Sequence, residues 1–244
     1  MLFDTPRGGQ LVWLFDLDNT LHNASHAIFP AIGGNMNRFI ATLVGDGNGG
    51  PAAPEVSNAL RLDYLRRYGA TLLGMVRHHQ VRPEHFLDEA HRFDDLISMI
   101  RAERGLGQLL RRLPGRKILL TNAPHHYARE VLRHLGVGHH FARHIAIESM
   151  WVHGQLRPKP SRAMLRKLLA REKLAPHRCV LVEDTVGHLK AAKTLGLRTA
   201  WVTQYMASNP NLRMRRGVLA RRPVYVDVKV QSVRQLPNRL QRLR

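Results

Sequence analysis

The feature that most constrains the fold is a series of short apolar runs separated by amphipathic helical patterns. Six runs of four or five residues are apolar enough to be buried strands: Leu11–Phe15, Lys117–Leu120, His144–Ile147, Cys179–Val182, Thr199–Val202 and Val224–Val228. Helical patterns lie between several of them, at His126–Leu135, Ser161–Lys173 and Val186–Leu195. Strands that alternate with helices form parallel sheets, because each crossover returns the chain to the same edge. The sequence therefore predicts an α/β fold with a doubly wound, Rossmann-like parallel sheet.

One long segment interrupts this alternation and contains no convincing buried strand. Asn58–Tyr68 and Pro83–Phe93 have helical character, whereas Gly45–Pro54 is too rich in Gly and Pro to be helical. We therefore expect residues 22–104 to form a helical cap domain, inserted directly after the first strand. The core would then comprise residues 1–21 and 105–244. The cap is expected to close over the strand ends as a lid, and a permanently packed helical layer is the alternative.

The composition narrows the class of protein. No apolar run approaches the length of a membrane span, and the first ten residues lack the apolar segment of a signal peptide. Cys179 is the single cysteine, so no disulfide can form within the chain. This cysteine usage fits a reducing compartment, and we expect a cytoplasmic enzyme that does not engage a membrane.

The formal net charge of +20 is the unusual number in this sequence. Such a charge is typical of nucleic-acid binding, or of attraction to smaller anions. The arginines are spread along the helical patterns, however, and only Arg213–Arg222 concentrates them. We therefore expect the charge to attract a small phosphorylated substrate, with dedicated nucleic-acid binding as the less favoured reading.

Two pairs of acids stand where apolar strands end. Asp16 and Asp18 follow the first strand in the motif DLDNT, and Glu183 and Asp184 close the strand CVLV. An acid at a buried strand end loses hydration, and a second acid nearby adds repulsion, so both resist ionising. A bound cation would offset this cost. Alone, each pair could simply end a turn or face a helix N-terminus.

Two further polar groups follow the same logic. In TNAP, Thr121 offers a hydroxyl, and the amides of Asn122 and Ala123 can face an anion where a helix begins. In RPKPS, Lys159 stands between two prolines on a stiff backbone, and Ser161 caps the next helix. A helix cap and a solvated lysine are the ordinary alternatives. With all four groups expected at carboxyl ends of strands, a shared phosphate and cation site is favoured.

The order Asp-x-Asp, Thr, Lys, Glu-Asp resembles that of the haloacid dehalogenase-like hydrolases, and the insertion point of the cap agrees. Within that superfamily, five segments are similar to the bacterial pyrimidine 5'-nucleotidases: Leu21–His26, Tyr68–Val81, Ala90–Leu96, Leu113–Pro124 and Gly154–Ser161. Several of these lie in the cap, where substrate choice would be made.

The resemblance implies roles for the acids. Asp16 would be the nucleophile that forms an aspartyl-phosphate, and Asp18 would be the general acid and base. Relatives that cleave carbon–halogen bonds lack this second acid, so Asp18 favours phosphoryl transfer. Mg²⁺ would be held by the Asp16 carboxylate, the Asp18 backbone carbonyl and Asp184. Glu183 would act through a water or orient a ligand.

The resemblance also implies a phosphate cradle. Lys159, Thr121 and the backbone amide of Asn122 would hold the phosphate oxygens, and Lys159 would also bridge to Asp16. The chain departs from many relatives at His188, where they carry Asn. No predicted ligand is lost by this change.

These readings predict a Mg²⁺-dependent phosphomonoesterase acting on pyrimidine nucleoside 5'-monophosphates such as UMP and CMP. The alternatives are a phosphatase or phosphomutase for another small phosphometabolite, such as a sugar phosphate, and a nucleic-acid-binding protein on an inactive scaffold. In the cap, His91 and Arg92 are expected to contact the base or ribose, with a solvated helix face as the equal alternative. The chain has 15 histidines, but adjacent His pairs are poor chelates, so no transition-metal site is expected.

Overall fold

The computed structural model describes residues 10–206 and 221–243 of the chain. These residues form two compact units. One contains the described residues up to His26 together with those from Ile100 onward, and the other is Ala27–Met99. We call the first unit the core and the second the cap.

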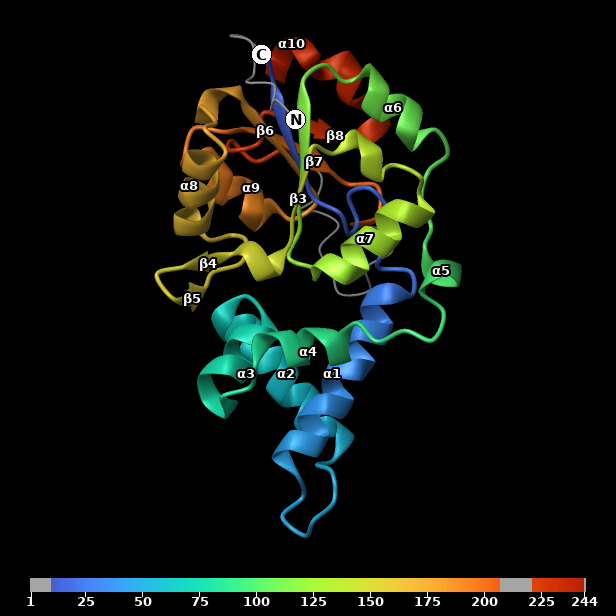
Figure 1. The fold of residues 1–244 in the computed structure, drawn as a ribbon, viewed down its shortest axis with the longest axis vertical. Coiled ribbons are helices and arrows are strands. Elements are labelled where there is room, and N and C mark those ends of the chain that lie inside the picture. The colour runs from blue at the N-terminus through green and yellow to red at the C-terminus, as the bar shows by residue number, and fades with distance from the viewer. Residues whose placement is uncertain (1–9, 207–220, 244) are drawn as a thin grey trace. The chain divides into compact units, whose positions relative to one another are not determined.

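The core is built on a six-stranded parallel sheet (Figure 1). Its strands, in sheet order, are β3 (Arg143–Ile145), β2 (Arg116–Leu120), β1 (Val12–Phe15), β6 (Cys179–Glu183), β7 (Arg198–Val202) and β8 (Val228–Val230). Every neighbouring pair is parallel. The chain moves outward from β1 to β3 and then returns to the other side of β1. Because parallel crossovers are right-handed, this reversal sends the helices to opposite faces, so the predicted doubly wound fold is confirmed.

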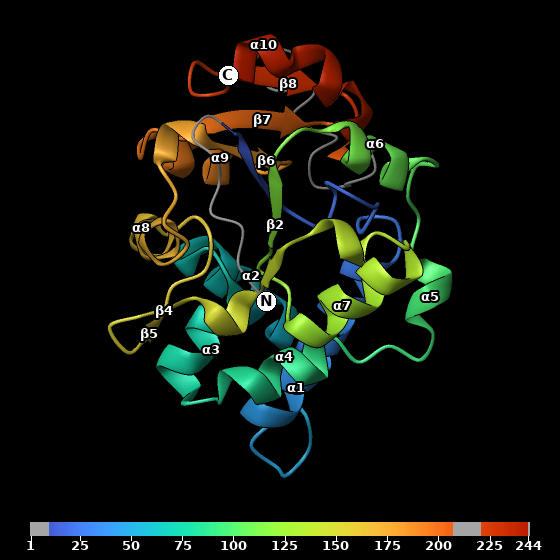
Figure 2. The same cartoon turned by 45° about the horizontal axis from the view of Figure 1, so that its top comes forward.

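The helices of the core flank this sheet. Figure 2 shows α6 and α7 on one side of the strands and α8 and α9 on the other. The α-helices of the core are α6 (Leu106–Arg112), α7 (His125–His134), α8 (Arg162–Arg171), α9 (Val186–Lys193) and α10 (Leu240–Leu243). Short 3₁₀ turns span Gly138–His140, Ile147–Ser149, Pro176–Arg178 and Val233–Arg239. A small antiparallel pair joins β4 (Trp151–Val152) to β5 (Gln155–Leu156).

Strand β1 lies at the centre of the sheet, which explains its continuous apolar run. All four of its residues are buried, and Leu14 pairs in register with Ile118 on one side and Leu181 on the other. Trp13 buries its ring completely and donates its indole N–H to the Pro114 carbonyl at 2.8 Å. A strand covered on both faces and both edges supplies a rigid base for the residues that follow it.

The last predicted strand is wrong at its start. Strand β8 covers Val228–Val230, not Val224–Val228, and Val224 is 97% exposed. The amide of Val226 donates to the carbonyl of Pro223 at 3.0 Å, so the chain turns before it can pair with β7. Most of the basic segment Arg213–Arg222 lies outside the described residues.

The cap, Ala27–Met99, contains helices and no strand, and every residue in it is described. Its helices are α1 (Ile28–Val44), α2 (Pro54–Tyr68), α3 (Thr71–His79), α4 (Pro83–Ala90) and α5 (Leu96–Met99). Between α1 and α2, the Asp46 carboxylate accepts hydrogen bonds from the amides of Asn48 and Gly50, which forms the predicted non-helical loop.

The bounds of this unit are narrower than the expected 22–104. Residues 22–26 belong to the core because Asn19 holds Ser25 through two hydrogen bonds, of 2.8 and 3.0 Å. The amide of Asn23 also donates to the Arg101 carbonyl at 2.7 Å, which ties the two connecting segments together.

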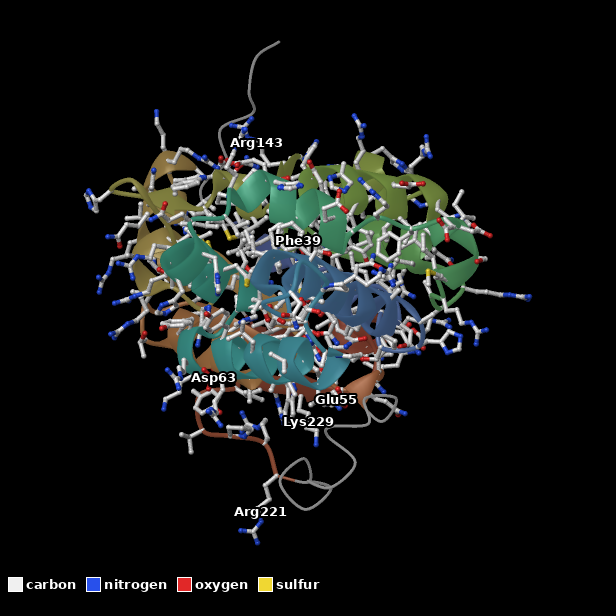
Figure 3. All side chains as sticks on the ribbon, turned by 90° about the horizontal axis from the view of Figure 1, so that it is seen from below. Phe39, Glu55, Asp63, Arg143, Arg221 and Lys229 are labelled. Carbon is white, nitrogen blue, oxygen red and sulfur yellow. The ribbon has the colours of Figure 1, made fainter. Side chains whose placement is uncertain are left out.

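The cap has its own buried contacts. Asn35 of α1 is buried and donates to the carbonyls of Ala90 and Arg92, which fixes α1 against the end of α4. Phe39, labelled in Figure 3, meets Phe86 edge-to-face at 5.2 Å. The cap is thus a packed helical unit and not a loose insertion.

Candidate active site

The carboxyl ends of β1, β2 and β6 bring the polar motifs together. Phe15 pairs with Leu119 and Val182, so Asp16 lies level with Leu120 and Glu183 at one edge of the sheet. The Asp16 amide donates to the Val182 carbonyl at 3.0 Å, which continues the ladder by one residue. The pairing of the buried strands therefore places side chains from separate motifs next to one another at the carboxyl edge of the sheet.

Three carboxylates gather at this edge. Oxygens of Asp16, Glu183 and Asp184 all lie within 4.8 Å of one another. Burial raises the pKa of Asp16 to about 7; the Glu183 carboxylate adds to this rise, and the Lys159 ammonium opposes it. Burial, and then Glu183, raises the pKa of Asp184 well above its ordinary value. Acids held this close resist full ionisation, and their hard oxygen atoms fit a divalent cation such as Mg²⁺.

Lys159 is the resident cation of the cluster. Its ammonium lies 2.6 Å from Asp16 Oδ1 and 2.8 Å from Glu183 Oε2, and the residue is 3% exposed. Burial alone would lower the pKa of Lys159, but the Asp16 and Glu183 carboxylates outweigh it and raise that pKa. Burial likewise would raise the pKa of Glu183, but Lys159 and then His188 hold it well below its ordinary value. The expected bridge from Lys159 to Asp16 is present, and Glu183 shares it.

The route by which Lys159 reaches the acids differs from the prediction. It does not follow a strand of the parallel sheet; it comes from the loop after the β4–β5 hairpin. The Asn122 side chain holds that loop by accepting from the Lys159 amide at 2.9 Å and donating to the Lys159 carbonyl at 3.0 Å. Ser161 then caps α8, as predicted, by accepting from the Met164 amide at 3.2 Å.

The TNAP motif after β2 also differs from the prediction in one hydrogen bond. The Ala123 amide, expected to face an anion, instead donates to Thr121 Oγ1 at 3.0 Å. A hydroxyl that accepts a hydrogen bond still has its own O–H to donate. Thr121 is buried directly after β2, at the same sheet edge as Asp16.

Asp18 contacts two buried side chains that the sequence analysis did not identify. Its Oδ1 accepts from the Tyr127 hydroxyl at 2.6 Å and lies 2.9 Å from His22 Nε2. Tyr127 and His22 are essentially fully buried, and their polar atoms are 3.5 Å apart. Burial, and then the Asp18 carboxylate, raises the pKa of Tyr127 well above its ordinary value, so the phenol remains a donor.

A tight turn after β1 creates this arrangement. Asn19 adopts a left-handed φ of 58°, and the Leu21 amide donates to the Leu17 carbonyl at 2.8 Å. The Thr20 hydroxyl donates to Asp16 Oδ2 at 3.1 Å, so the same turn also holds the first acid. Asn tolerates this conformation better than most residues, which gives the Asn of the DLDNT motif a structural reason.

Two further residues support the second acid pair. His188 Nδ1 lies 3.0 Å from Glu183 Oε2, so the residue that departs from many relatives contacts the cluster directly. The Trp201 indole donates to the Asp184 carbonyl at 2.9 Å and holds the backbone at the end of β6. The neighbouring strand β7 thus helps to position Asp184.

The predicted cap residues make their described contacts within the cap. His91 Nδ1 lies 2.9 Å from the Leu87 carbonyl, and Arg92 pairs with Glu89 at 2.5 Å. Arg92 also lines a cavity of about 590 Å³ formed by residues of α1 and α4. Their predicted role toward a substrate stays a prediction.

Comparison with solved structures shows which proteins share the fold of this chain. The chain is similar to a phosphatase of the haloacid dehalogenase superfamily from Thermococcus onnurineus (TM-score 0.62, 15% identity, covering 95% of this chain and 97% of that one). It is similar to L-2-haloacid dehalogenase from Xanthobacter autotrophicus (TM-score 0.56, 16% identity, 95% and 98% covered) and to a putative β-phosphoglucomutase from Thermotoga maritima (TM-score 0.55, 18%, 95% and 99%). These likenesses establish a shared fold.

The family itself is shown by the sequence. The family model for haloacid dehalogenase-like hydrolases matches residues 12–196, a span that includes every acid and the lysine of the cluster. The chain belongs to this family of hydrolases, as its motif order predicted. Within the residues that the structure describes, no helix is both long and apolar enough to cross a bilayer.

Proposed function

We propose that this hydrolase is a Mg²⁺-dependent phosphomonoesterase that works through an aspartyl-phosphate on Asp16. The observation that supports it best is the second acid: Asp18 lies two residues beyond the buried Asp16, and its carboxylate is in contact with Tyr127 and His22. A phosphoryl-transfer enzyme needs both a nucleophile and a proton donor for the leaving oxygen. Carbon–halogen cleavage needs no such donor.

The two acids account for both halves of the reaction. An Asp16 oxygen attacks phosphorus, the phosphorus–ester bond breaks with its electron pair going to the leaving oxygen, and Asp18 gives that oxygen a proton. Water then attacks the same phosphorus and gives a proton to the Asp18 carboxylate. The bond between phosphorus and Asp16 breaks, which releases phosphate and restores both acids.

The other residues of the cluster would bind and orient the substrate. Lys159, Thr121 and the backbone amide of Asn122 are proposed to hold the phosphate oxygens as their charge builds. Asp16, Asp184 and the Asp18 backbone carbonyl would hold Mg²⁺, with Glu183 acting through a water or by keeping Lys159 in place. When bound, this ion supplies positive charge against the phosphate and the acids.

For the substrate we propose pyrimidine nucleoside 5'-monophosphates of the UMP and CMP type. The support is the similarity of the cap segments to the pyrimidine 5'-nucleotidases, with His91 and Arg92 as the proposed contacts to the base or ribose. A sugar phosphate is the second candidate, because phosphatases and phosphomutases share the same catalytic groups and the Thermotoga maritima relative is a putative phosphomutase. The single cysteine also fits a cytoplasmic setting for either substrate.

A substrate panel with Mg²⁺ tests these proposals. UMP and CMP should be hydrolysed far faster than AMP or glucose 6-phosphate, and Asp16→Asn should abolish turnover while the far-UV circular dichroism is unchanged. Faster hydrolysis of a sugar phosphate would select the second candidate. Full activity in Asp16→Asn protein would refute the mechanism. Salt-sensitive DNA or RNA binding without phosphatase activity would instead support the nucleic-acid reading of the +20 charge.

A further inference from the structure

Two buried residues, Tyr127 and His22, contact the carboxylate of Asp18 and come from different parts of the core. Tyr127 comes from α7, which follows β2, while His22 comes from the turn after β1. Both converge on a single oxygen of the Asp18 carboxylate, Oδ1, at 2.6 and 2.9 Å. The hydrogen bond from Tyr127 spans 109 positions of sequence, so it depends on the assembled core.

His22 contacts Asp18 through one ring nitrogen. Nε2 lies 2.9 Å from Asp18 Oδ1, and the imidazole tautomer that donates this hydrogen bond has its N–H at Nε2. Nδ1 is buried and has no hydrogen-bond partner among the described residues. Leaving a buried polar atom unpaired is unfavourable, so the hydrogen bond at Nε2 is the one that offsets the burial of this ring.

The two donors occupy Oδ1. A carboxylate oxygen has about two lone-pair positions in its plane, and the Tyr127 hydroxyl and the His22 imidazole take both. We propose that Tyr127 and His22 are positioning residues that hold the Asp18 side chain by Oδ1, in the orientation that proton transfer to the leaving oxygen requires. This inference rests on the proposed function, because it refines how Asp18 serves the leaving oxygen.

The role makes a prediction that depends on the leaving group. When an alkyl phosphate is cleaved, the leaving alkoxide needs the proton from Asp18 as its bond to phosphorus breaks. When p-nitrophenyl phosphate is cleaved, the stable phenolate leaves without that proton. A misplaced Asp18 therefore slows alkyl ester cleavage more than aryl ester cleavage, whereas a general distortion of the site slows both equally.

The experiment uses the full chain with Mg²⁺ and compares kcat/KM for UMP with kcat/KM for p-nitrophenyl phosphate. This constant reports the steps up to loss of the leaving group, so the later hydrolysis of the aspartyl-phosphate does not mask the effect. Tyr127→Phe should lower the UMP to p-nitrophenyl phosphate ratio about tenfold or more, the effect of losing a hydrogen bond to a charged group.

Variants at His22 test the same proposal independently of Tyr127. His22→Leu should lower the same ratio, whereas His22→Gln, which keeps an N–H donor at about the position of Nε2, should restore most of it. Tyr205→Phe is the matched control, because this tyrosine is also buried in the core but lies against Glu103, and its ratio should equal that of the wild type. If Tyr127→Phe fails to fold, the His22 pair decides alone.

The outcomes separate the inference from the proposed function. Equal losses on both substrates in Tyr127→Phe and His22→Leu would overturn the positioning role and leave the phosphatase proposal standing. If the wild type cleaves p-nitrophenyl phosphate but not UMP, the alkyl phosphate of the panel that it cleaves fastest takes the place of UMP in the ratio of kcat/KM values. A wild-type protein inactive on every ester would refute the proposed function itself.

Discussion

Replacing Lys159 with Met should cost more stability than any other single charge removal in the described core. The variant leaves the Asp16 and Glu183 carboxylates buried, at 6% and 1% exposure, without the ammonium that lies 2.6 and 2.8 Å from them. Breaking a buried ion pair by removing one partner typically costs about 3–5 kcal/mol. Methionine retains most of the side-chain volume, so the loss measures charge and not a cavity.

Urea denaturation of Lys159→Met and of the wild type, each in EDTA and in Mg²⁺, measures this cost. The urea midpoint in EDTA should fall at an unchanged slope, and the gap between the proteins should narrow in Mg²⁺, because a bound cation replaces part of the lost charge. Lys193→Met is the matched control. Its partner Asp227 is 2.6 Å away, but the two side chains are 31% and 18% exposed, so it should cost only about 1 kcal/mol. A Lys159→Met loss no larger than the control would refute the reasoning.

Three further predictions concern the backbone at Gly115, the hydrogen bonds from Asn122 to the Lys159 backbone, and the Cys179 thiol. Gly115 has a φ of 91°, and a β-carbon there would collide with a main-chain oxygen just ahead of β1. Gly115→Ala should therefore lower the free energy of unfolding by about 2 kcal/mol or more. Gly136 also has a left-handed φ, but nothing lies within 4 Å of a β-carbon there, so Gly136→Ala should lower the melting temperature less than Gly115→Ala does. Asn122→Ala removes both hydrogen bonds to the Lys159 backbone, so kcat should fall at least tenfold while far-UV circular dichroism is retained. An unchanged kcat would show that Asn122 is not needed to position Lys159. Burial raises the pKa of the Cys179 thiol to about 12, so the unfolded chain ionises first above about pH 8.5 and the folded state loses stability as pH rises further. Denaturation series at pH 7 to 10.5 should show a decline that Cys179→Ala lacks, and parallel declines would contradict the assignment.

Much of the core follows from local patterns. The run from Leu11 to Phe15 could only be a covered strand, and β1 is buried at every position. Because carboxyl ends of parallel strands share one edge, the convergence of Asp16 with Glu183 was predictable from their places in the chain. The matched motif order then led to the correct family.

Other parts of the site depend on contacts that no local pattern encodes. Lys159 enters from a hairpin loop, and only the assembled fold shows that Asn122 holds it there. Tyr127 reads in sequence as an ordinary apolar position of an amphipathic helix, and its hydroxyl meets Asp18 only through tertiary packing. The strand near Val224 was misplaced because apolar composition cannot reveal a turn set by backbone bonds to Pro223.

The buried lysine has a consequence for which ions the site can accept. If all three carboxylates of the cluster were ionised, as a bound cation would favour, they and the one ammonium would sum to a charge of −2. One divalent ion brings that balance to zero, whereas a single monovalent ion leaves an excess negative charge that would repel a phosphate dianion. In the proposed mechanism, Lys159 would thereby match the charge of the cluster to one divalent ion before any substrate arrives, and a chain with a neutral residue at this position would favour a more highly charged ion.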